Sequence, residues 1–243
     1  MQKIIGLMGY VNKSDFVINL AKVLDIMGKK VLVIDGTVEN RLKYTVPKIE
    51  KDKASYITNY DRVDYAIGFK NMEDIKTYLC NEISDVDSYD IVLIDIDNIY
   101  SYENFRTNNI SMIYFFMEYT NISIAKNKEI LQALLDAKPV EGDKELVITK
   151  VLFRNYITRA SVEYYENKTG DFNVLWTNDP YELPYDDQDR IADIESQQSG
   201  YIELSKHTKG FENTIIDMTV DIIGDATAGE VKKILKTYVR GRA

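Results

Sequence analysis

Residues 3–35 read KIIGLMGYVNKSDFVINLAKVLDIMGKKVLVID, and this stretch decides the fold. It opens with an apolar run over 3–8 that predicts a buried strand, and apolar residues at helical spacing follow from 16 to 27. Gly28 ends that predicted helix. Residues 30–35 are an almost continuous β-branched run, typical of a parallel strand covered on both faces. Strand, helix and strand make one βαβ unit.

The rest of the chain continues this alternation. Strand-like runs lie at 89–95, 111–116, 145–149 and 172–176, and helix-like segments lie at 72–83, 123–137, 156–167 and 211–223. Such alternation predicts an α/β fold with a doubly wound, mostly parallel sheet of about seven strands flanked by helices. Ligands of these sheets bind beyond the carboxyl ends of the strands. The polar, tyrosine-containing segments 37–64 and 181–209 are expected to be loops over that crevice.

Composition narrows the class of protein. No linker-like stretch interrupts the 243 residues, so we expect a single domain over 1–243. The single cysteine, Cys80, and the single histidine, His207, exclude a disulfide framework or a His/Cys metal cluster within one chain. The apolar start lacks the pattern of a signal peptide, so a cytoplasmic location is expected. A net charge of -9 argues against broad DNA binding but leaves a local basic patch open.

The segment between the first strand and the first helix carries the chemistry. A joint of this kind points backbone N–H groups and the positive end of a helix dipole at its loop, which favours phosphate. Within the segment, Lys13 would reach the β- and γ-phosphates of a nucleotide, and the Ser14 hydroxyl would help to hold Mg²⁺. The alternative is a capped helix start with a solvated lysine.

Three blocks of sequence resemble the ParA/MinD group of P-loop ATPases. The first runs from Val11 to Asp35: a loop ending in Lys-Ser, then Asn-Leu-Ala in the helix, then Gly-Lys-Lys-Val-Leu-Val-Ile-Asp. The second, 89–95, is similar to the strand that ends in an aspartate near the metal and γ-phosphate. The third, 183–186, is similar to the turn near the adenine, followed by a helix, a short strand-like run over 201–204 and a last helix. The resemblance covers nearly the whole chain.

This resemblance implies ATP and Mg²⁺ as ligands. It implies catalytic roles for Asp35 and Asp95, which would also hold Mg²⁺ together with Ser14; helix capping is the other interpretation of the two aspartates. The nucleotide-binding residues that it implies are Gly9, Tyr10, Val11, Asn12, Lys13, Ser14, Asp15, Pro184, Tyr185 and Asp186.

The phosphate loop departs from the family pattern at several positions. Met8 stands where the family has an extra lysine that reaches across a nucleotide-sandwich dimer to stabilise charge. Tyr10 and Asn12 replace glycines that elsewhere permit a positive φ. Thr37 replaces the second aspartate of Asp-x-Asp, and residues 147–150 offer no counterpart of the asparagine that reads adenine. The loop is therefore interpreted as degenerate, with slow or absent hydrolysis.

The C-terminal segment 229–243 is a basic amphipathic helix or tail. Its five basic residues against Glu230 give a net charge of +4, and an apolar stripe runs through Val231, Ile234, Leu235 and Tyr238. In MinD-like relatives such a helix lies on anionic membrane, so Val231 to Val239 is a candidate for peripheral contact with the inner face of the membrane. The alternative is that the stripe packs against the domain or a partner.

The resemblance implies a positional or assembly factor, for a pilus, a secretion or flagellar machine or a plasmid. Its expected partners are a second copy of the chain in a homodimer and protein components of the larger assembly, with DNA unlikely. Three alternatives stay open: a nucleotide-free pseudo-ATPase scaffold, a DNA-segregating ParA-type ATPase, and a metabolic enzyme of the same superfamily.

Overall fold

The computed structural model describes residues 2–46, 54–82, 85–106, 110–137, 147–155, 163–165, 167–168, 174–177 and 179–242. Its strands are β1 Lys3–Met8, β2 Val31–Asp35, β3 Tyr56–Tyr60, β4 Val63–Ile67, β5 Ile91–Ile96, β6 Ile110–Met117, β7 Val147–Asn155, β8 Leu175–Trp176 and β9 Tyr181–Pro184. Within these residues they form one sheet in the order β3-β4-β2-β5-β1-β6-β7-β8, and β9 also pairs with β7. Every pair is parallel except the β3–β4 hairpin. The predicted doubly wound sheet is confirmed.

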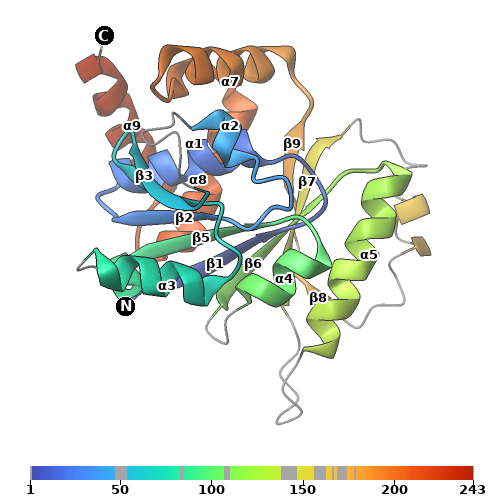
Figure 1. Ribbon diagram of the computed structural model, residues 1–243. Helices are drawn as coiled ribbons and strands as arrows, with labels where there is room; N and C mark the ends of the chain where they lie inside the picture. The colour runs from blue at the N-terminus through green and yellow to red at the C-terminus, as the bar shows by residue number, and fades with distance from the viewer. Residues whose placement is uncertain are drawn as a thin grey trace.

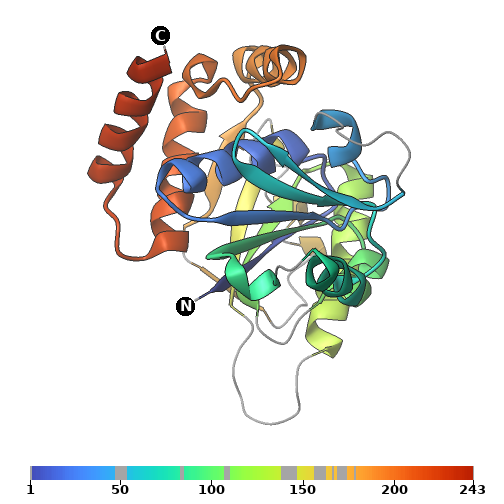
Figure 2. The same ribbon diagram turned by 60° about the vertical axis from the view of Figure 1, so that its left-hand side comes forward.

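Helices cover both faces of this sheet (Figure 1). They are α1 Ser14–Ile26, α2 Leu42–Thr45, α3 Met72–Asn81, α4 Ile99–Phe105, α5 Asn121–Asp136, α7 Asp187–Ser199, α8 Lys209–Ile223 and α9 Ala228–Arg242, with short 3₁₀ turns at Val86–Ser88 and Leu204–Lys206. Helices α1, α8 and α9 lie on one face and α3, α4 and α5 on the other (Figures 1 and 2). Each face therefore has its own apolar core.

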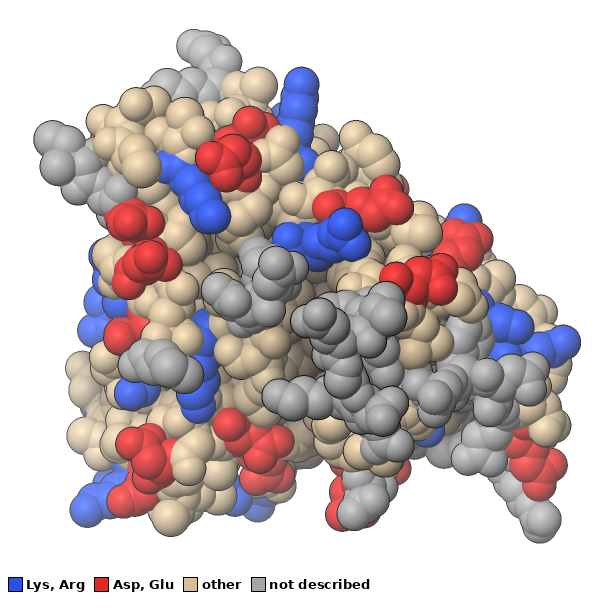
Figure 3. All heavy atoms as spheres, turned by 90° about the horizontal axis from the view of Figure 1, so that it is seen from below, with Lys and Arg blue, Asp and Glu red and all other residues tan. Residues whose placement is uncertain are grey.

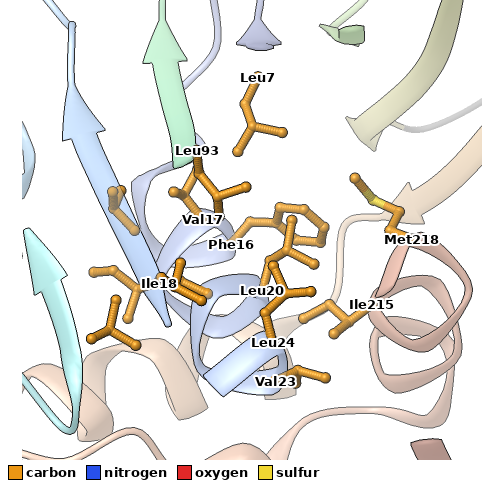
Figure 4. Packing of buried hydrophobic residues seen from close by; sticks show 14 of the residues in the cluster. Leu7, Phe16, Val17, Ile18, Leu20, Val23, Leu24, Leu93, Ile215 and Met218 are labelled. Atoms are coloured by element: carbon orange, nitrogen blue, oxygen red, sulfur yellow. The ribbon is translucent and has the colours of Figure 1, made fainter. Parts of the chain in front are cut away.

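Helix α1 is the centre of the core on its face. Its apolar residues recur at helical spacing, so one side of the helix contacts the sheet and α8 (Figure 4). Phe16 contacts Phe116 of β6 and Phe211 of α8 edge to face, with ring centroids 5.5 Å and 5.7 Å apart. This packing fixes the start of α1, and hence the loop that precedes it, against the carboxyl edge of the sheet.

The segment 37–64, predicted as a loop, instead contains β3 and the start of β4. Their two-residue turn places Asp61 and Arg62 at φ values of 47° and 73°. Turns of this kind usually carry Asn-Gly or Asp-Gly, so the Asp-Arg pair at this turn is not a hairpin signal. The buried Lys22 ammonium lies 2.9 Å from the Asp61 carboxylate and supports the turn from α1.

Other boundaries also differ from prediction. The strand-like run 201–204 is not a strand, and a 3₁₀ turn begins at Leu204. Strand β7 continues to Asn155, six residues beyond the predicted end, whereas β8 is limited to Leu175–Trp176 among the described residues. Most of the helix predicted over 156–167 lies outside the described residues.

Helix α9 packs its apolar stripe against the domain. Val231 and Leu235 are 0% and 7% exposed and belong to the core shared with α1 and α8, while Ile234 remains partly exposed. Figure 2 shows α8 and α9 side by side. The stripe proposed for membrane contact is thus largely used within the fold. No helix in the described part of the chain has the length and apolarity needed to cross a bilayer.

The face covered by α3, α4 and α5 carries charges of both signs. Figure 3 views the molecule from below Figure 1, and the described Lys and Arg side chains are interspersed there with Asp and Glu. Among the described side chains this face has no continuous basic track of the kind that DNA binding requires.

Gly9 allows the first turn after β1, and its replacement should be costly. At φ 128°, an added Cβ would lie 2.1 Å from the Phe116 carbonyl oxygen. We expect Gly9→Ala to lower the free energy of unfolding by at least about 3 kcal/mol, measured by urea denaturation. Gly28→Ala is the control, because its φ of 81° is also positive but nothing lies within 4 Å. It should cost only about 1–2 kcal/mol, and equal losses in the two variants would contradict this account.

Candidate functional site

Three neighbouring parallel strands bring the predicted site residues to one edge of the sheet. Strands β2, β5 and β1 lie side by side, and Asp35 and Asp95 are register partners at the ends of β2 and β5. Asp95 also pairs in register with Leu7, so the loop after β1 begins beside it. Adjacent strands are about 4.8 Å apart, so the loop and both carboxylates meet in one place.

The loop from Gly9 to Ser14 is held by the protein itself. Gly9 has a positive φ, whereas Tyr10 and Asn12 do not. The loop therefore does not need glycine at those two positions. The Tyr10 backbone N–H donates to Oδ1 of the buried Asn127 at 2.7 Å. Asn127 on α5, which sequence analysis missed, therefore uses a loop amide that is otherwise free to face phosphate.

The start of α1 retains features of an anion site. Lys13 occupies the N-cap position without a side-chain cap, and the first amides of a helix have no partner within the helix. Ser14 is buried, and its Oγ has no hydrogen-bond partner among the described residues. A buried hydroxyl without a partner costs free energy, which suits a group that awaits a ligand.

The Lys13 side chain is fully buried and does not extend into solvent. Its Nζ lies 3.0 Å from the Gly9 carbonyl oxygen, 3.1 Å from that of Ile96 and 2.7 Å from Asp95 Oδ1. The two charged side chains are 0% and 1% exposed. The ammonium therefore donates to two carbonyl oxygens and forms an ion pair with Asp95. Lys13 thus links the loop to the end of β5, and the interpretation as a solvated lysine is wrong.

Asp35 anchors the segment that follows β2. Its Oδ1 accepts hydrogen bonds from the Thr37 N–H at 3.1 Å and the Thr37 hydroxyl at 2.6 Å, and its Oδ2 accepts from the Leu42 N–H at 2.8 Å. Burial raises the pKa of Asp35 to about 6, against these hydrogen bonds and with a contribution from Asp95. Burial also raises the pKa of Asp95, while Lys13 opposes that shift. The structure therefore gives Asp35 the capping role that was the other interpretation.

The donors predicted for Mg²⁺ are chemically suitable. Ser14 Oγ and the carboxylates of Asp35 and Asp95 are oxygen ligands, and Mg²⁺ is typically bound through one or two carboxylates with phosphate oxygens and water. Within the described residues no group of three His, Cys, Asp or Glu side chains is placed to hold a metal alone. The residues fit a magnesium ion that arrives with phosphate, rather than a permanent metal centre.

A hollow of about 540 Å³ opens beside the loop. Sequence analysis missed two of its cations, Arg41 and Arg190, since both come from segments expected to be irregular. Arg41 donates to the Val11 carbonyl oxygen at 3.0 Å and lies 3.3 Å from Asp97. The residues on its wall include Asn12, Ser14, Asp15, Arg41, Arg190 and Gln197.

The predicted adenine turn lies outside the wall of this hollow. Pro184 ends β9, Tyr185 is exposed, and Asp186 caps α7 by accepting a hydrogen bond from the Gln188 N–H at 2.8 Å. Asn155 ends β7 in register with Pro184. An asparagine does therefore end a late strand next to this turn. Sequence analysis missed it by ending the strand at Thr149.

Met8 lies in the core and is fully buried, packed with the apolar residues on the face of α3, α4 and α5. Its side chain therefore does not project toward a second copy of the chain. The position that the family fills with a charge-stabilising lysine contributes apolar packing here.

The described residues define an α/β protein of the P-loop type, with a strand–loop–helix joint at the carboxyl edge of a parallel sheet. More narrowly, the fold is that of the ParA/MinD ATPases. A ParA family ATPase from Chlorobium tepidum TLS superposes with a TM-score of 0.60 at 16% identity, covering 90% of this chain and 99% of that chain. The MinC:MinD cell division protein complex of Aquifex aeolicus gives 0.60 at 13% identity, covering 93% and 97%.

A third similar structure is a putative plasmid partition protein from Borrelia burgdorferi bound to AMPPNP. It has a TM-score of 0.54 at 13% identity, and the match covers 99% of this chain and 100% of that chain. No family model matches this chain, and no curated protein matches it. At these identities the likeness establishes the fold.

Asp35 should titrate well above an ordinary aspartate, with a midpoint of about 6 in a carboxyl carbon NMR titration. The folded chain then holds this proton up to about pH 6, whereas the unfolded chain releases it near 3.8. The contribution of this group to the free energy of unfolding therefore falls by about 3 kcal/mol in total as the pH rises from well below 3.8 to well above 6, and about 2 kcal/mol of this loss lies between pH 4 and 6. Mg²⁺ should lower the midpoint, and a midpoint near 4 would show that burial does not control this carboxyl.

The Lys13–Asp95 pair should behave as one unit in a double-mutant cycle. Lys13→Met and Asp95→Asn each leave a buried charge unpaired, so each should cost about 3 kcal/mol or more in urea unfolding. The loss of unfolding free energy in the double variant should be at least about 2 kcal/mol smaller than the sum of the losses in the two single variants. The exposed pair Lys126–Glu129, 2.9 Å apart, is the control and should couple by less than about 1 kcal/mol. Additive losses at Lys13 and Asp95 would rule out the coupling.

Proposed function

We propose that this chain, over 1–243, is one nucleotide-binding domain that holds ATP with Mg²⁺ at residues 9–15. It hydrolyses the nucleotide slowly or not at all and works as a positional or assembly factor. The observation that carries the proposal is the meeting of Lys13, Ser14, Asp35 and Asp95 at one sheet edge, beside a hollow of about 540 Å³.

Each residue of the site has a role in this proposal. Lys13 supplies positive charge at the loop, and the first amides of α1 face phosphate. The Ser14 hydroxyl, which has no hydrogen-bond partner among the described residues, becomes a ligand of Mg²⁺. Arg41 bonds the loop at the Val11 carbonyl and adds a second cation at the mouth of the hollow. Bound Mg²⁺ would shield the phosphates from the carboxylates of Asp35 and Asp95. The similar plasmid partition protein bound to AMPPNP supports a nucleotide as the ligand.

Slow hydrolysis is expected because neither Met8 nor Thr37 can do what the corresponding family residues do. Met8 is buried in the core and cannot stabilise the charge that develops in phosphoryl transfer. The Thr37 hydroxyl is already engaged with Asp35 at 2.6 Å, so it is poorly placed to activate water. The nucleotide therefore acts as a ligand that sets the state of the protein.

A positional role in a homodimer, with protein partners, is the corresponding biological proposal. The similar MinC:MinD complex supports a protein partner. The similar plasmid partition protein leaves DNA segregation as an alternative role for the same nucleotide-binding protein. The net charge of -9 and the mixed charges of Figure 3 weigh against DNA.

The nucleotide-free scaffold is the second candidate, and one observation favours it. Lys13 already donates to two carbonyl oxygens and pairs with Asp95, and this buried ion pair must be rearranged before its ammonium can reach phosphate.

Calorimetry with Mg²⁺ and the slowly hydrolysed analogue AMPPNP decides between the two candidates. We expect binding in the micromolar range by the wild type, and at least about tenfold weaker binding by Ser14→Ala, which removes a magnesium ligand. Because Ser14 Oγ makes no hydrogen bond among the described residues, the midpoint of thermal unfolding should not fall in this variant. A long incubation with ATP should release little phosphate.

Two controls make the result specific. Ser14→Thr keeps the hydroxyl and should bind like the wild type, and the Ser14→Ala effect should disappear when Mg²⁺ is omitted. No binding by the wild type, with or without Mg²⁺, would replace the proposal with the scaffold.

A further inference from the structure

Asp15 places a carboxylate within the first turn of α1, at the wall of the proposed phosphate site. Its Oδ2 lies 2.9 Å from Arg190 Nη1, and its Oδ1 accepts a hydrogen bond from Gln197 Nε2 at 2.6 Å. Both partners come from α7, seven residues apart on one face of that helix. All three side chains line the hollow beside Asn12 and Ser14.

The Asp15 carboxylate and a phosphate would compete for the same two groups, the start of α1 and the Arg190 guanidinium. The start of α1 stabilises negative charge through its free amides and dipole, and Asp15 already supplies one negative charge there. A guanidinium binds carboxylate and phosphate with the same forked geometry. The Arg190 side chain is 41% exposed while that of Asp15 is 11% exposed, so Arg190 is the partner with room to turn toward a ligand.

We propose that Asp15 is a built-in competitor for phosphate, an autoinhibitory contact that weakens nucleotide binding by occupying Arg190 and by repelling the phosphates. This inference rests on the proposed function and adds a regulatory contact to the same site. When a nucleotide binds, Arg190 exchanges the Asp15 carboxylate for a phosphate oxygen. Nucleotide occupancy thereby changes the contact that joins α1 to α7.

Helix α7 has a second attachment, so Asp15 can be changed without loss of the fold. Asp193 of α7 lies 2.7 Å from Arg154 Nη2 and accepts a hydrogen bond from Asn19 Nδ2 at 3.3 Å. Neither contact uses the Asp15 side chain. Asp15→Asn should therefore keep α7 in place, which thermal unfolding and circular dichroism will check.

The test is the affinity of Asp15→Asn for AMPPNP with Mg²⁺ at low salt, measured by calorimetry. Removal of one negative charge near the phosphates should tighten binding roughly tenfold, with a smaller gain at high salt. Binding of adenosine, which has no phosphate, should not change. The matched control is Asp74→Asn, which removes an equal charge from the first turn of α3 on the other face of the sheet and should bind like the wild type.

A second variant separates the two effects of Asp15. Arg190→Gln in the Asp15→Asn background should weaken AMPPNP binding by roughly the same tenfold, because in Asp15→Asn the Arg190 guanidinium has a phosphate oxygen as its partner. If Arg190 serves only to hold Asp15, the single and double variants will bind equally, and the exchange of Arg190 is wrong.

The possible outcomes distinguish this inference from the proposed function. Binding by the wild type and Asp74→Asn with roughly tenfold tighter binding by Asp15→Asn supports the inference. Equal binding by the wild type, Asp15→Asn and Asp74→Asn overturns the inference and leaves the proposed function standing. No binding by any of the three overturns both.

Discussion

The buried ion pair between Lys13 and Asp95 is the constraint on which the rest of the site depends. Two charges removed from water are tolerated only with close geometry and additional hydrogen bonds, which the Gly9 and Ile96 carbonyls provide here. The pair joins the start of α1 to the end of β5, so it fixes the loop between β1 and α1. The edge of the sheet, the loop and the first turn of α1 consequently form one unit.

The sequence predicted the fold where the signal was local and failed where tertiary contacts decide. Continuous apolar runs identify β1, β2 and β5 because a parallel strand buried on both faces must be apolar along its length. The β3–β4 hairpin has no such signal, because its turn is supported by a tertiary contact: Lys22 from α1 donates to the Asp61 carbonyl oxygen at 2.6 Å and pairs with the Asp61 carboxylate. The strand expected at 201–204 failed for a related reason: a short apolar run does not specify a strand without a neighbouring strand to pair with.

The same distinction applies to the site. Spacing along the chain brought Lys13, Asp35 and Asp95 together, since the ends of adjacent parallel strands must meet. It could not assign Arg190 or Asn127 to the loop, because each comes from a helix far along the chain and no local pattern marks it. Nor could it predict that the hydrogen bonds of Asp35 go to Thr37 and Leu42, which makes this aspartate an anchor of the following segment.

The charges around the loop indicate that the proposed nucleotide would bind together with Mg²⁺. Three basic side chains, Lys13, Arg41 and Arg190, face five carboxylates, those of Asp15, Asp35, Glu39, Asp95 and Asp97. Each of the three cations already has a carboxylate partner. Lys13 pairs with Asp95, Arg41 with Glu39 and Asp97, and Arg190 with Asp15. Among the side chains that the structure describes around the loop, a polyanion alone would therefore meet excess negative charge and no unpaired cation. A divalent cation would reverse this balance at the carboxylates. Because the pKa of Asp35 is raised to about 6, protons would compete with the metal for this carboxylate below that pH, and binding of Mg²⁺ would release the proton to solvent.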